Sequence, residues 1–428
     1  MAGFDQTLAS DVAKNQYLGP VNEALNQSTI LLSKIKRKES TQGKNITFPV
    51  HYGRNTSAGL GVAEGGTLPT AGSQLYKAGV IPLVYQYGRL QLTGQVIAAT
   101  RNDKGAFVRA IGAEMKSIFT DFKRAKNRQL HGNGLDVLAY ATSAISTTNT
   151  YTLDDGNGFG YVHIPSGQSI QIDILNPATF ASKVTVGSSG YPTATAGAST
   201  ATGVSVTITV GAGTSVSGGA DNDLIVPAFQ SSSTITGTTP NRSKQMMGLE
   251  GIISASDPAG VSTGLHGLDV STYPFWSAQT VGSDSSFVDL KTSDLQKVFT
   301  KIESNSDFTA DDVEFILCSP QLRDKYAEVC IAERRTTNSM KLDNGFSAVT
   351  FNTTPIVVDP QCKHGRFYFV VPETMGIFQM GDLAFMEEDG AVWSRVANQD
   401  GYEATLYHYA NLGCTNRNGN GVLLGCNE

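Results

Sequence analysis

The chain has 428 residues, enough for two or three domains with buried cores. Charged residues make up only 16% of it, against about 25% in ordinary soluble domains. Electrostatic repulsion between the surfaces of two copies is therefore weak. The net charge of -6 argues against a dedicated nucleic-acid binder, whose domains usually carry a basic surplus. This composition favours a protein that assembles.

Residues 1–45 are predicted to form an N-terminal arm. A helical pattern within it ends at the basic run Lys34–Lys38, and we favour a solvated surface over a phosphate grip for this run and for Lys123–Arg128. Neither 18 consecutive apolar residues nor a signal-peptide layout occurs, so we expect a protein made and kept in a cytoplasm, with no membrane contact. The helical pattern is carried by Val21, Leu25, Leu31, Leu32 and Ile35.

Residues 46–100 are predicted to be an extended hairpin flap with the strands of a peripheral domain. Two β-prone stretches, 45–53 and 75–88, enclose a glycine-rich run from Ser57 to Gln74 whose single charge is Glu64. Hairpin loops in compact domains usually take about 2–5 residues. A flap this long needs a surface to lie on, and another subunit can supply that surface.

The glycines of this run also suggest a phosphate-binding loop, in which backbone N–H groups surround an anion and lead into a helix. The residues that follow are instead strand formers. Gly59, Gly61 and Gly65 lack the spacing of such a loop, and no G-K-[ST] occurs nearby. We therefore favour a flap between two strands over a nucleotide site.

Residues 101–135 are predicted to contain a long spine helix, from Asp103 to Leu130. Asn102 or Asp103 can cap its start, and Gly132 stops it. At about 1.5 Å per residue the helix is roughly 40 Å long, which suits a structural beam. One apolar stripe at helical spacing is formed by Phe107, Ile111, Met115, Ile118, Phe119, Phe122 and Ala125.

Residues 136–245 are predicted to be an inserted β-rich domain. Short strands such as VSVTITV alternate with Ser, Thr and Gly, which predicts a small sandwich or barrel. Asp154, Asp155 and Asn157 offer oxygens for calcium, but the acidic residue that a calcium loop needs further on is missing. A plain turn is favoured there.

The remaining chain is predicted to contain a linker with a peripheral-domain segment (246–285), an axial domain (286–395) and closing strands (396–428). The axial domain alternates helices and strands, which indicates an α/β layout with added antiparallel strands. Thr292 or Ser293 is expected to cap its first helix, and Pro320 lies in the first turn of its second.

Signals for catalysis or metal binding are weak. The six histidines are scattered, and no G-x-S-x-G or H-E-x-x-H occurs. The five cysteines form no C-x-x-C pair, and only Cys362 with His364 approaches metal-site spacing, so we expect reduced, buried thiols. The acidic groups Asp311–Asp312 and Glu387–Asp389 are expected in solvated turns. No enzymatic activity, metal or cofactor is predicted.

With flap, long helix and α/β domain in this order, the chain resembles the major capsid proteins of tailed bacteriophages, which have the Hong Kong 97-like fold. The resemblance rests on an E-G-x-x-x-P element (Glu64, Gly65 and Pro69), on the second β stretch RLQLTGQVI, which leads into the long helix, and on the final WSRVANQDGYEATLYHYANLG. It covers most of the chain, and residues 136–245 correspond to an insertion found in some members.

The resemblance implies an α+β, Hong Kong 97-like fold with an extended β-hairpin flap, a long spine helix, an α/β axial domain and an inserted β-rich domain. It implies a major capsid protein that assembles into hexamers and pentamers of an icosahedral shell, starting as a procapsid and enclosing double-stranded DNA. The flap is expected to lie on a neighbouring subunit and to change its tilt as the shell expands. The expected assembly residues are Glu64, Gly65, Gly66, Pro69, Phe107, Ile111, Met115, Phe119 and Phe122.

The implied partners are copies of this chain, a separate scaffold protein, a portal and decoration proteins, with only non-specific contact to packaged DNA. The implied location is the virion capsid, assembled in the host bacterial cytoplasm. Some members crosslink subunits through a flap lysine; Lys77 is the nearest candidate, but nothing in the sequence identifies its partner, and no crosslink is predicted.

Two alternatives stay open at this point. The Gly/Ser/Thr-rich middle of the chain also suits a tail or fibre subunit, which predicts trimers or tubes. A carbohydrate-active enzyme would use Asp311, Glu314 or Glu387 as acids and would be a monomer with a cleft.

Overall fold

The computed structural model forms two compact units. One unit contains the described residues of Tyr87–Lys123 and Ala384–Tyr407, and the other contains those of Ser28–Gln86, Arg124–Leu383 and His408–Glu428. The structure describes residues 29–38, 43–99, 110–160, 162–164, 167–200, 203–228, 245–258, 261, 263–332, 339–341, 347–387 and 391–428.

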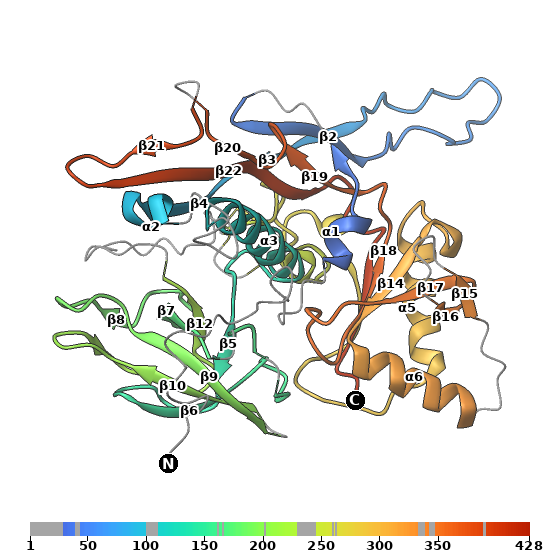
Figure 1. Ribbon diagram of the computed structural model, residues 1–428. Coiled ribbons are helices and arrows are strands. Elements are labelled where there is room, and N and C mark those ends of the chain that lie inside the picture. The colour runs from blue at the N-terminus through green and yellow to red at the C-terminus, as the bar shows by residue number, and fades with distance from the viewer. Residues whose placement is uncertain are drawn as a thin grey trace, which may run out of the picture. The chain divides into compact units, whose positions relative to one another are not determined.

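The predicted flap is confirmed as a β-hairpin (Figure 1). Strands β2 (Asn45–Gly53) and β3 (Leu75–Pro82) pair antiparallel, with a register shift between His51 and Gly53. Strand β4 (Val84–Thr93) follows. The stretch RLQLTGQVI is strand only to Thr93, because helix α2 (Gly94–Ala99) begins at Gly94, so the expectation of one continuous strand is wrong. The amide of Gly94 donates to the carbonyl of Asp400, which turns the chain away from the sheet.

The long helix is α3 (Ala110–His131). Its predicted end is confirmed, since Gly132 closes the last turn with a bond to the carbonyl of Gln129. The predicted start at Asn102 or Asp103 lies outside the described residues. No helix among the described residues is long and apolar enough to cross a membrane.

The inserted domain is a closed barrel rather than a sandwich. Its interior is filled by aliphatic side chains at alternate positions, such as Ile172 and Ile174, which are fully buried. Strands β8 (Val184–Thr185) and β11 (Ser215–Val216) form a separate pair. The barrel strands, in neighbour order, are β10 (Gly203–Thr209), β6 (Asn149–Asp154), β5 (Ala139–Ala141), β12 (Leu224–Pro227), β7 (Ser169–Leu175) and β9 (Thr193–Thr200).

A seven-stranded sheet forms the centre of the α/β domain. Helices α5 (Thr292–Asn305) and α6 (Pro320–Ala332) pack on one face of it, with Phe299 against Phe369. The other face, including Phe315 and Val370, packs against helices α1 (Ile30–Lys34) and α4 (Leu249–Ile252). The strands, in order, are β13 (Gln279–Gly282), β23 (Gly421–Leu424), β18 (Phe367–Val370), β14 (Phe315–Cys318), β17 (Thr354–Val358), β16 (Ser347–Phe351) and β15 (Ser339–Lys341).

One predicted detail of this domain is wrong. The N-cap of α5 is Lys291, whose backbone is extended, and Thr292 is already the first helical residue. The short helix η3 (Ala310–Asp312) instead has a complete capping box, in which Thr309 and Asp312 satisfy each other's backbone amides.

The described end of the predicted arm belongs to the core. Helix α1 (Ile30–Lys34) buries Leu31 and Leu32, and β1 (Arg37–Lys38) pairs in parallel with β19 (Met375–Gln379). Strand β19 also pairs with the final part of β22 (Gly401–Cys414). The predicted N-terminal arm therefore contributes Leu31 and Leu32 to the core, and residues 1–28 lie outside the described part.

In the other unit, the first part of β22 carries two short antiparallel strands. These are β20 (Ala384–Phe385) and β21 (Ser394–Arg395). A salt bridge between Arg89 and Glu403 lies in the same unit. The predicted closing strands thus exist, but β23 leaves them for the sheet of the α/β domain.

Candidate assembly surface

The stem of the flap is anchored to its own unit by aromatic packing. The Phe48 ring lies 6.3 Å from the His266 ring and 6.2 Å from Trp276, centroid to centroid. The amide of Val80 donates to the carbonyl of His266 at 2.8 Å. Gly79 is opposite Phe48 in the register, and a Cβ there would lie 2.4 Å from Phe48 Cζ. A glycine is required at this position because the ring crosses the neighbouring strand.

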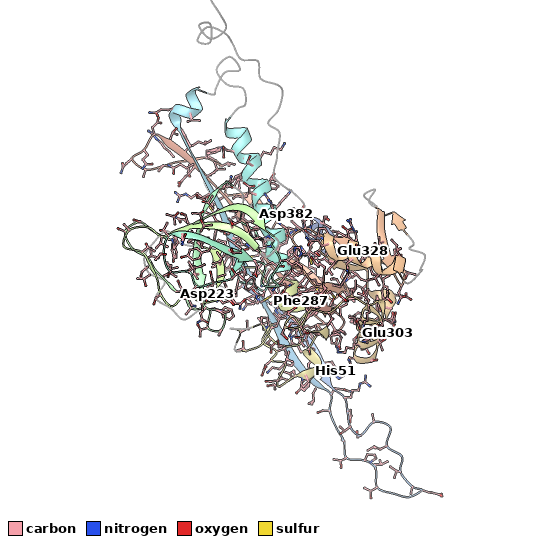
Figure 2. The ribbon with its side chains drawn as sticks, turned by 90° about the horizontal axis from the view of Figure 1, so that it is seen from below. His51, Asp223, Phe287, Glu303, Glu328 and Asp382 are labelled. Carbon is pink, nitrogen blue, oxygen red and sulfur yellow. The ribbon has the colours of Figure 1, made fainter. Side chains whose placement is uncertain are left out.

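The tip of the flap is closed at its neck by side-chain hydrogen bonds. Asn55 Nδ2 donates to the carbonyl of Gly72 at 3.0 Å, and Asn55 Oδ1 accepts the amide of Ser57 at 2.9 Å. Beyond the neck the chain runs out from the body of the unit past His51 (Figure 2). No helix follows the glycine-rich run, because β3 begins at Leu75, so the structural context of a phosphate-binding loop is absent.

Three of the predicted assembly residues lie in one turn at the tip. Gly66 donates its amide to the carbonyl of Ala63 at 2.9 Å, and Gly65 has φ +74°, a conformation that favours glycine. Glu64 is exposed in this turn, and Pro69 is half-buried. The geometry of this turn is therefore enough to explain why glycines occupy positions 65 and 66, independently of what the flap contacts.

The flap exposes large apolar side chains. Leu68 is 80% exposed, and Leu60, Val62, Leu75 and Tyr76 are exposed as well. Single exposed apolar residues are ordinary, but a group of them on one projecting hairpin is typical of a contact site. Neither catalytic nor charged side chains are concentrated on the flap. Its exposed surface is suited to burial against another apolar surface.

The predicted stripe of α3 is described only in part. Phe107 lies outside the described residues, and Ile111 is in the helix but its side chain is not described. Met115, Phe119 and Phe122 are half-buried. A Cβ on Gly88 of β4 would lie 3.5 Å from Phe122 Cδ2, so this part of the stripe faces a strand of the same chain. A role of these side chains between subunits stays a prediction.

A buried carboxylate that the sequence did not point to joins α1, α3 and the end of β17. Asp359 accepts the amide of Leu31 at 3.2 Å and Asn127 Nδ2 at 3.0 Å, and its Oδ2 lies 3.1 Å from His131 Nε2. Burial favours a higher pKa for Asp359, but His131, Asn127 and the amide of Gln361 outweigh it and lower the pKa to about 2. Asp359 therefore remains ionised and is structural.

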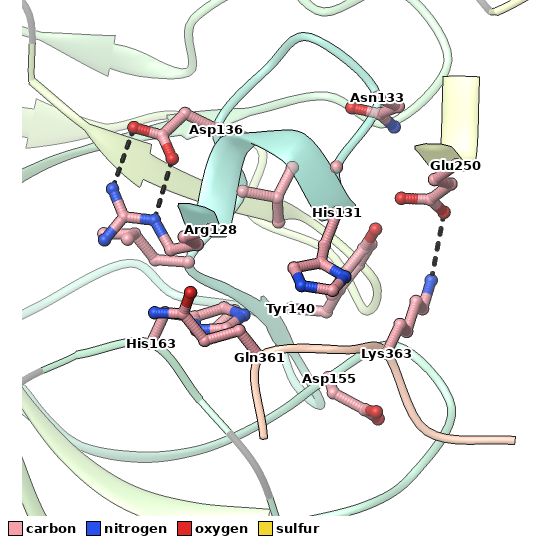
Figure 3. Close-up of a pocket in the computed structure, with 14 residues that line it drawn as sticks. Arg128, His131, Asn133, Asp136, Tyr140, Asp155, His163, Glu250, Gln361 and Lys363 are labelled. Atoms are coloured by element: carbon pink, nitrogen blue, oxygen red, sulfur yellow. Dashed lines mark hydrogen bonds and ion pairs between the residues drawn. The ribbon is translucent and has the colours of Figure 1, made fainter. Parts of the chain in front are cut away.

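A small pocket, lined by several charged side chains, lies beside this cluster (Figure 3). Its volume is ≈ 50 Å³, room for a water molecule or two. Arg128 holds Asp136 through two bonds of 2.8 and 2.9 Å, and Lys363 Nζ lies 3.3 Å from Glu250 Oε1. Burial would raise the pKa of Glu250, but Lys363 and Arg366 lower it to about 2. Glu250 is therefore ionised and cannot donate a proton at neutral pH.

The cysteines are buried and unpaired, which confirms the expected reduced thiols. Burial raises the pKa of Cys414 to about 11 and that of Cys426 to about 12, so both stay protonated at neutral pH. His364 does not pair with Cys362; its Nδ1 lies 2.5 Å from Glu428 Oε2. Among the described residues, no cluster of His, Cys, Asp or Glu could hold a metal ion.

The predicted plain turn at Asp154 and Asp155 is confirmed. Asp154 Oδ1 accepts the amide of Gly156 at 2.8 Å, and Asp155 Oδ1 accepts that of Asn157 at 2.9 Å. The other oxygen of Asp155 accepts the amide of His364 at 3.2 Å, so the turn joins the barrel to the α/β domain. Its oxygens are occupied by backbone donors rather than directed at an ion.

The acidic residues considered for catalysis lie on the surface. Asp311 and Glu314 are exposed in and just after η3, and Glu387 is exposed in the other unit. Glu388 and Asp389 lie outside the described residues. These positions are those expected of solvated turns.

Comparison with known proteins finds a likeness in fold. No family model and no curated protein matches this chain. A chain of the cyanophage A-1(L) capsid asymmetric unit matches with a TM-score of 0.61 at 10% identity, covering 99% of each chain. A chain of the capsid of a native GTA particle matches with a TM-score of 0.51 at 8% identity, covering 100% of each. The predicted α+β capsid fold is therefore confirmed.

Proposed function

We propose that this chain, which has the Hong Kong 97-like fold, is the major capsid protein of a tailed bacteriophage. In this proposal it assembles into hexamers and pentamers of an icosahedral shell that encloses double-stranded DNA. The observation that carries the proposal is the projecting flap with its uncovered apolar side chains, on a chain matched end to end by capsid chains.

The physical argument concerns the exposed apolar side chains of the flap. Leu60 and Leu68 at the tip and Tyr76 at the start of β3 are largely exposed to water in the isolated subunit. Covering them with a neighbouring copy removes apolar surface from water at roughly 25 cal/mol per Å². Each subunit of a closed shell covers one neighbour with its flap and is covered by the flap of another. Contacts of modest affinity, repeated in this way, together give a stable particle.

The conformation of the flap suits such a contact. Its stem is fixed by Phe48 against Trp276, whereas its tip is closed at the neck by hydrogen bonds of Asn55 and Ser57. The fixed stem sets the direction of the flap, and a glycine-rich tip with a single charge, Glu64, adapts to the surface beneath it. Glu64, Gly65, Gly66 and Pro69 act in this proposal by shaping the tip.

The remaining partners are part of the same proposal. They are a separate scaffold protein, a portal, decoration proteins and, without sequence specificity, packaged DNA. Assembly takes place in the bacterial cytoplasm, and the protein has no catalytic activity. Met115, Phe119 and Phe122 support assembly by stiffening α3. Phe107 and Ile111, whose side chains lie outside the described part, are proposed as assembly residues with them.

The test compares apolar and polar changes at the tip. The double variant Leu60→Ser/Leu68→Ser removes the exposed apolar groups, and deletion of Gly59–Gly72 removes the whole tip; both are expected to fold and to lose stable shells. The matched control Thr67→Ala/Thr70→Ala changes exposed polar groups on the same tip and should assemble normally. Sizing and negative-stain microscopy give the readout.

Normal shells from both the Ser variant and the deletion would contradict the role of the flap. If the unaltered chain forms only discrete trimers or tubes, a tail or fibre subunit is the better assignment. A concentration-independent monomer that cleaves glycans would support the enzyme instead.

A further inference from the structure

Helix α3 carries a lysine on its buried side. Lys126 is 7% exposed, and its Nζ lies 2.8 Å from His408 Nδ1 and 3.3 Å from His408 Nε2, on β22. In the part of the chain that the structure describes, no carboxylate lies within ion-pair distance of this amine. A buried ammonium whose nearest partner is an imidazole is an unusual arrangement, because burial strongly disfavours an unpaired charge.

The groups that face this pair come from three strands. Gln379 of β19 has its Oε1 3.2 Å from His408 Nε2, and its amide donates to Asp382 Oδ1 at 2.9 Å. Asp382 in turn pairs with Arg37 of β1 at 3.5 Å. The side chains of Arg37 and Asp382 are largely exposed. The carboxylate of this set is therefore already paired with another cation.

The hydrogen bonds assign the proton positions. Gln379 Oε1 is an acceptor, so His408 carries its proton on Nε2 and leaves Nδ1 to accept from Lys126. A second proton on the ring would occupy Nδ1 and break this bond. The pair therefore accommodates a neutral imidazole with either a neutral or a charged amine, and it does not accommodate two cations.

We propose that the Lys126–His408 contact is a proton-sensitive joint between α3 and the sheet formed by β19 and β22. The packing is tight when the amine is neutral and loosens when the amine is charged, since the ammonium then draws water towards the interface. The residues that make the joint are Lys126, His408 and Gln379.

The electrostatics place the protonation of the Lys126 amine close to neutral pH. Burial lowers the pKa of Lys126 to about 7, with Arg37 adding to the shift and Asp382 opposing it. Burial and the nearby Lys126 lower the pKa of His408 to about 3. The unfolded chain keeps the ordinary lysine pKa of 10.5, so it binds more protons than the folded chain between about pH 7 and 10.5. The contribution of this site to the free energy of unfolding therefore rises with pH between about pH 7 and 10.5. Below about pH 7 the full penalty for a charged Lys126 in the folded chain applies.

The joint lies close in sequence to the points where the chain passes from one compact unit to the other. The chain passes between the two compact units at 86/87, 123/124, 383/384 and 407/408. Lys126, Asp382 and His408 each lie close to one of these crossings. Acidification is therefore expected to loosen the packing of α3 on β19 and β22 within the unit that contains Lys126 and His408.

The test measures unfolding of the full chain in urea at pH 6, 7, 8 and 9. In the unaltered protein this site should make the unfolding equilibrium constant at least about tenfold larger at pH 6 than at pH 9. Lys126→Met should abolish that part of the pH dependence. The matched control Lys116→Met removes an exposed lysine of the same helix and should keep it. Identical pH dependence in Lys126→Met and the control would overturn the proposal.

A second measurement does not depend on the folding of a variant. In the full chain labelled with ¹³C at lysine Cε, one lysine signal should titrate near neutral pH, and the Lys116→Met protein should still show it. If every lysine signal titrates above pH 9, Lys126 is charged throughout and the proposal fails.

Discussion

At the scale of single residues, buried polar groups connect distant segments of the molecule through hydrogen bonds. Arg417 is the clearest case, because its side chain is completely buried just beyond the end of β22. Its guanidinium donates to the carbonyls of Ile252 at 2.5 Å and Ser256 at 2.6 Å, and it pairs with Asp257 at 3.1 Å. It thus satisfies carbonyls at the end of α4 (Leu249–Ile252) that the short helix leaves without donors.

Replacing Arg417 by Met is expected to lower the free energy of unfolding by about 3–5 kcal/mol, because several buried acceptors lose their donor at once. The urea midpoint of the full chain measures the change. Arg323→Met is the control: Arg323 pairs with Asp324 on the surface, where an ion pair contributes only about 0–1 kcal/mol. Equal stability of the two variants would show that the Arg417 bonds are not needed.

At the scale of elements, the flap combines an anchored stem with a free tip. An isolated two-stranded ribbon is at best marginally stable in water, so β2 and β3 need support from outside the hairpin. The segment after His266 provides it: Trp276 packs on Phe48, and Phe275 stacks on Tyr52 at 5.9 Å. The support ends near Gly53, where the register shifts, and the tip begins there.

Gly79→Ala is expected to loosen the stem, because the new methyl group meets the Phe48 ring and displaces it from Trp276. The expected loss is about 1–3 kcal/mol, as for other overpacked sites. Hydrogen exchange at the amide of Val80, which bonds to His266, should become faster. Gly61→Ala is the matched control at the tip, where a Cβ would meet nothing within 4 Å, and it should leave this exchange unchanged.

At the scale of the whole molecule, the two large folded parts differ in how the chain builds them. The barrel is continuous in sequence, and every member of its two core clusters lies between Leu135 and Val226. The seven-stranded sheet is assembled from distant segments, since β23 lies between β13 and β18. Its core needs Leu423 and Cys426 from the end of the chain.

A fragment of residues 134–228 is therefore expected to fold alone, with a β-type circular dichroism spectrum and a cooperative urea transition. A fragment of residues 286–395, the axial domain as delimited from sequence, lacks β13 and β23 and should show no such transition. If fragment 286–395 folds and fragment 134–228 does not, the barrel is not the part that folds independently, and the prediction is wrong.

Local patterns explain which elements could be predicted. The hairpin strands, α5, α6 and the end of α3 follow from periodicity, β-prone composition and stop signals such as Gly132, all of which act over a few residues. The helix that begins at Gly94 was missed because the stretch before it is strand-like and Asp400, far along the chain, accepts the amide of Gly94 and helps turn the backbone there. The cap of α5 was displaced by one residue, an ordinary uncertainty of helix ends.

The contacts that define the sites could not be predicted in the same way. Asp359 meets Leu31, and Lys126 meets His408, across hundreds of residues, and no local pattern marks either pair. The flap was predicted because its glycine-rich composition is itself local. Its apolar surface became visible only when the structure left Leu60 and Leu68 without cover.

The sequence by itself determined the order of elements, the charge-poor surface and the resemblance to capsid proteins, because composition and periodicity act locally along the chain. The tertiary structure alone decided that the insertion is a closed barrel, that residues 29–38 join the core, and that β23 completes a distant sheet. Strand pairing and the burial of charges depend on which distant segments meet, and that is set by the packing of the whole chain.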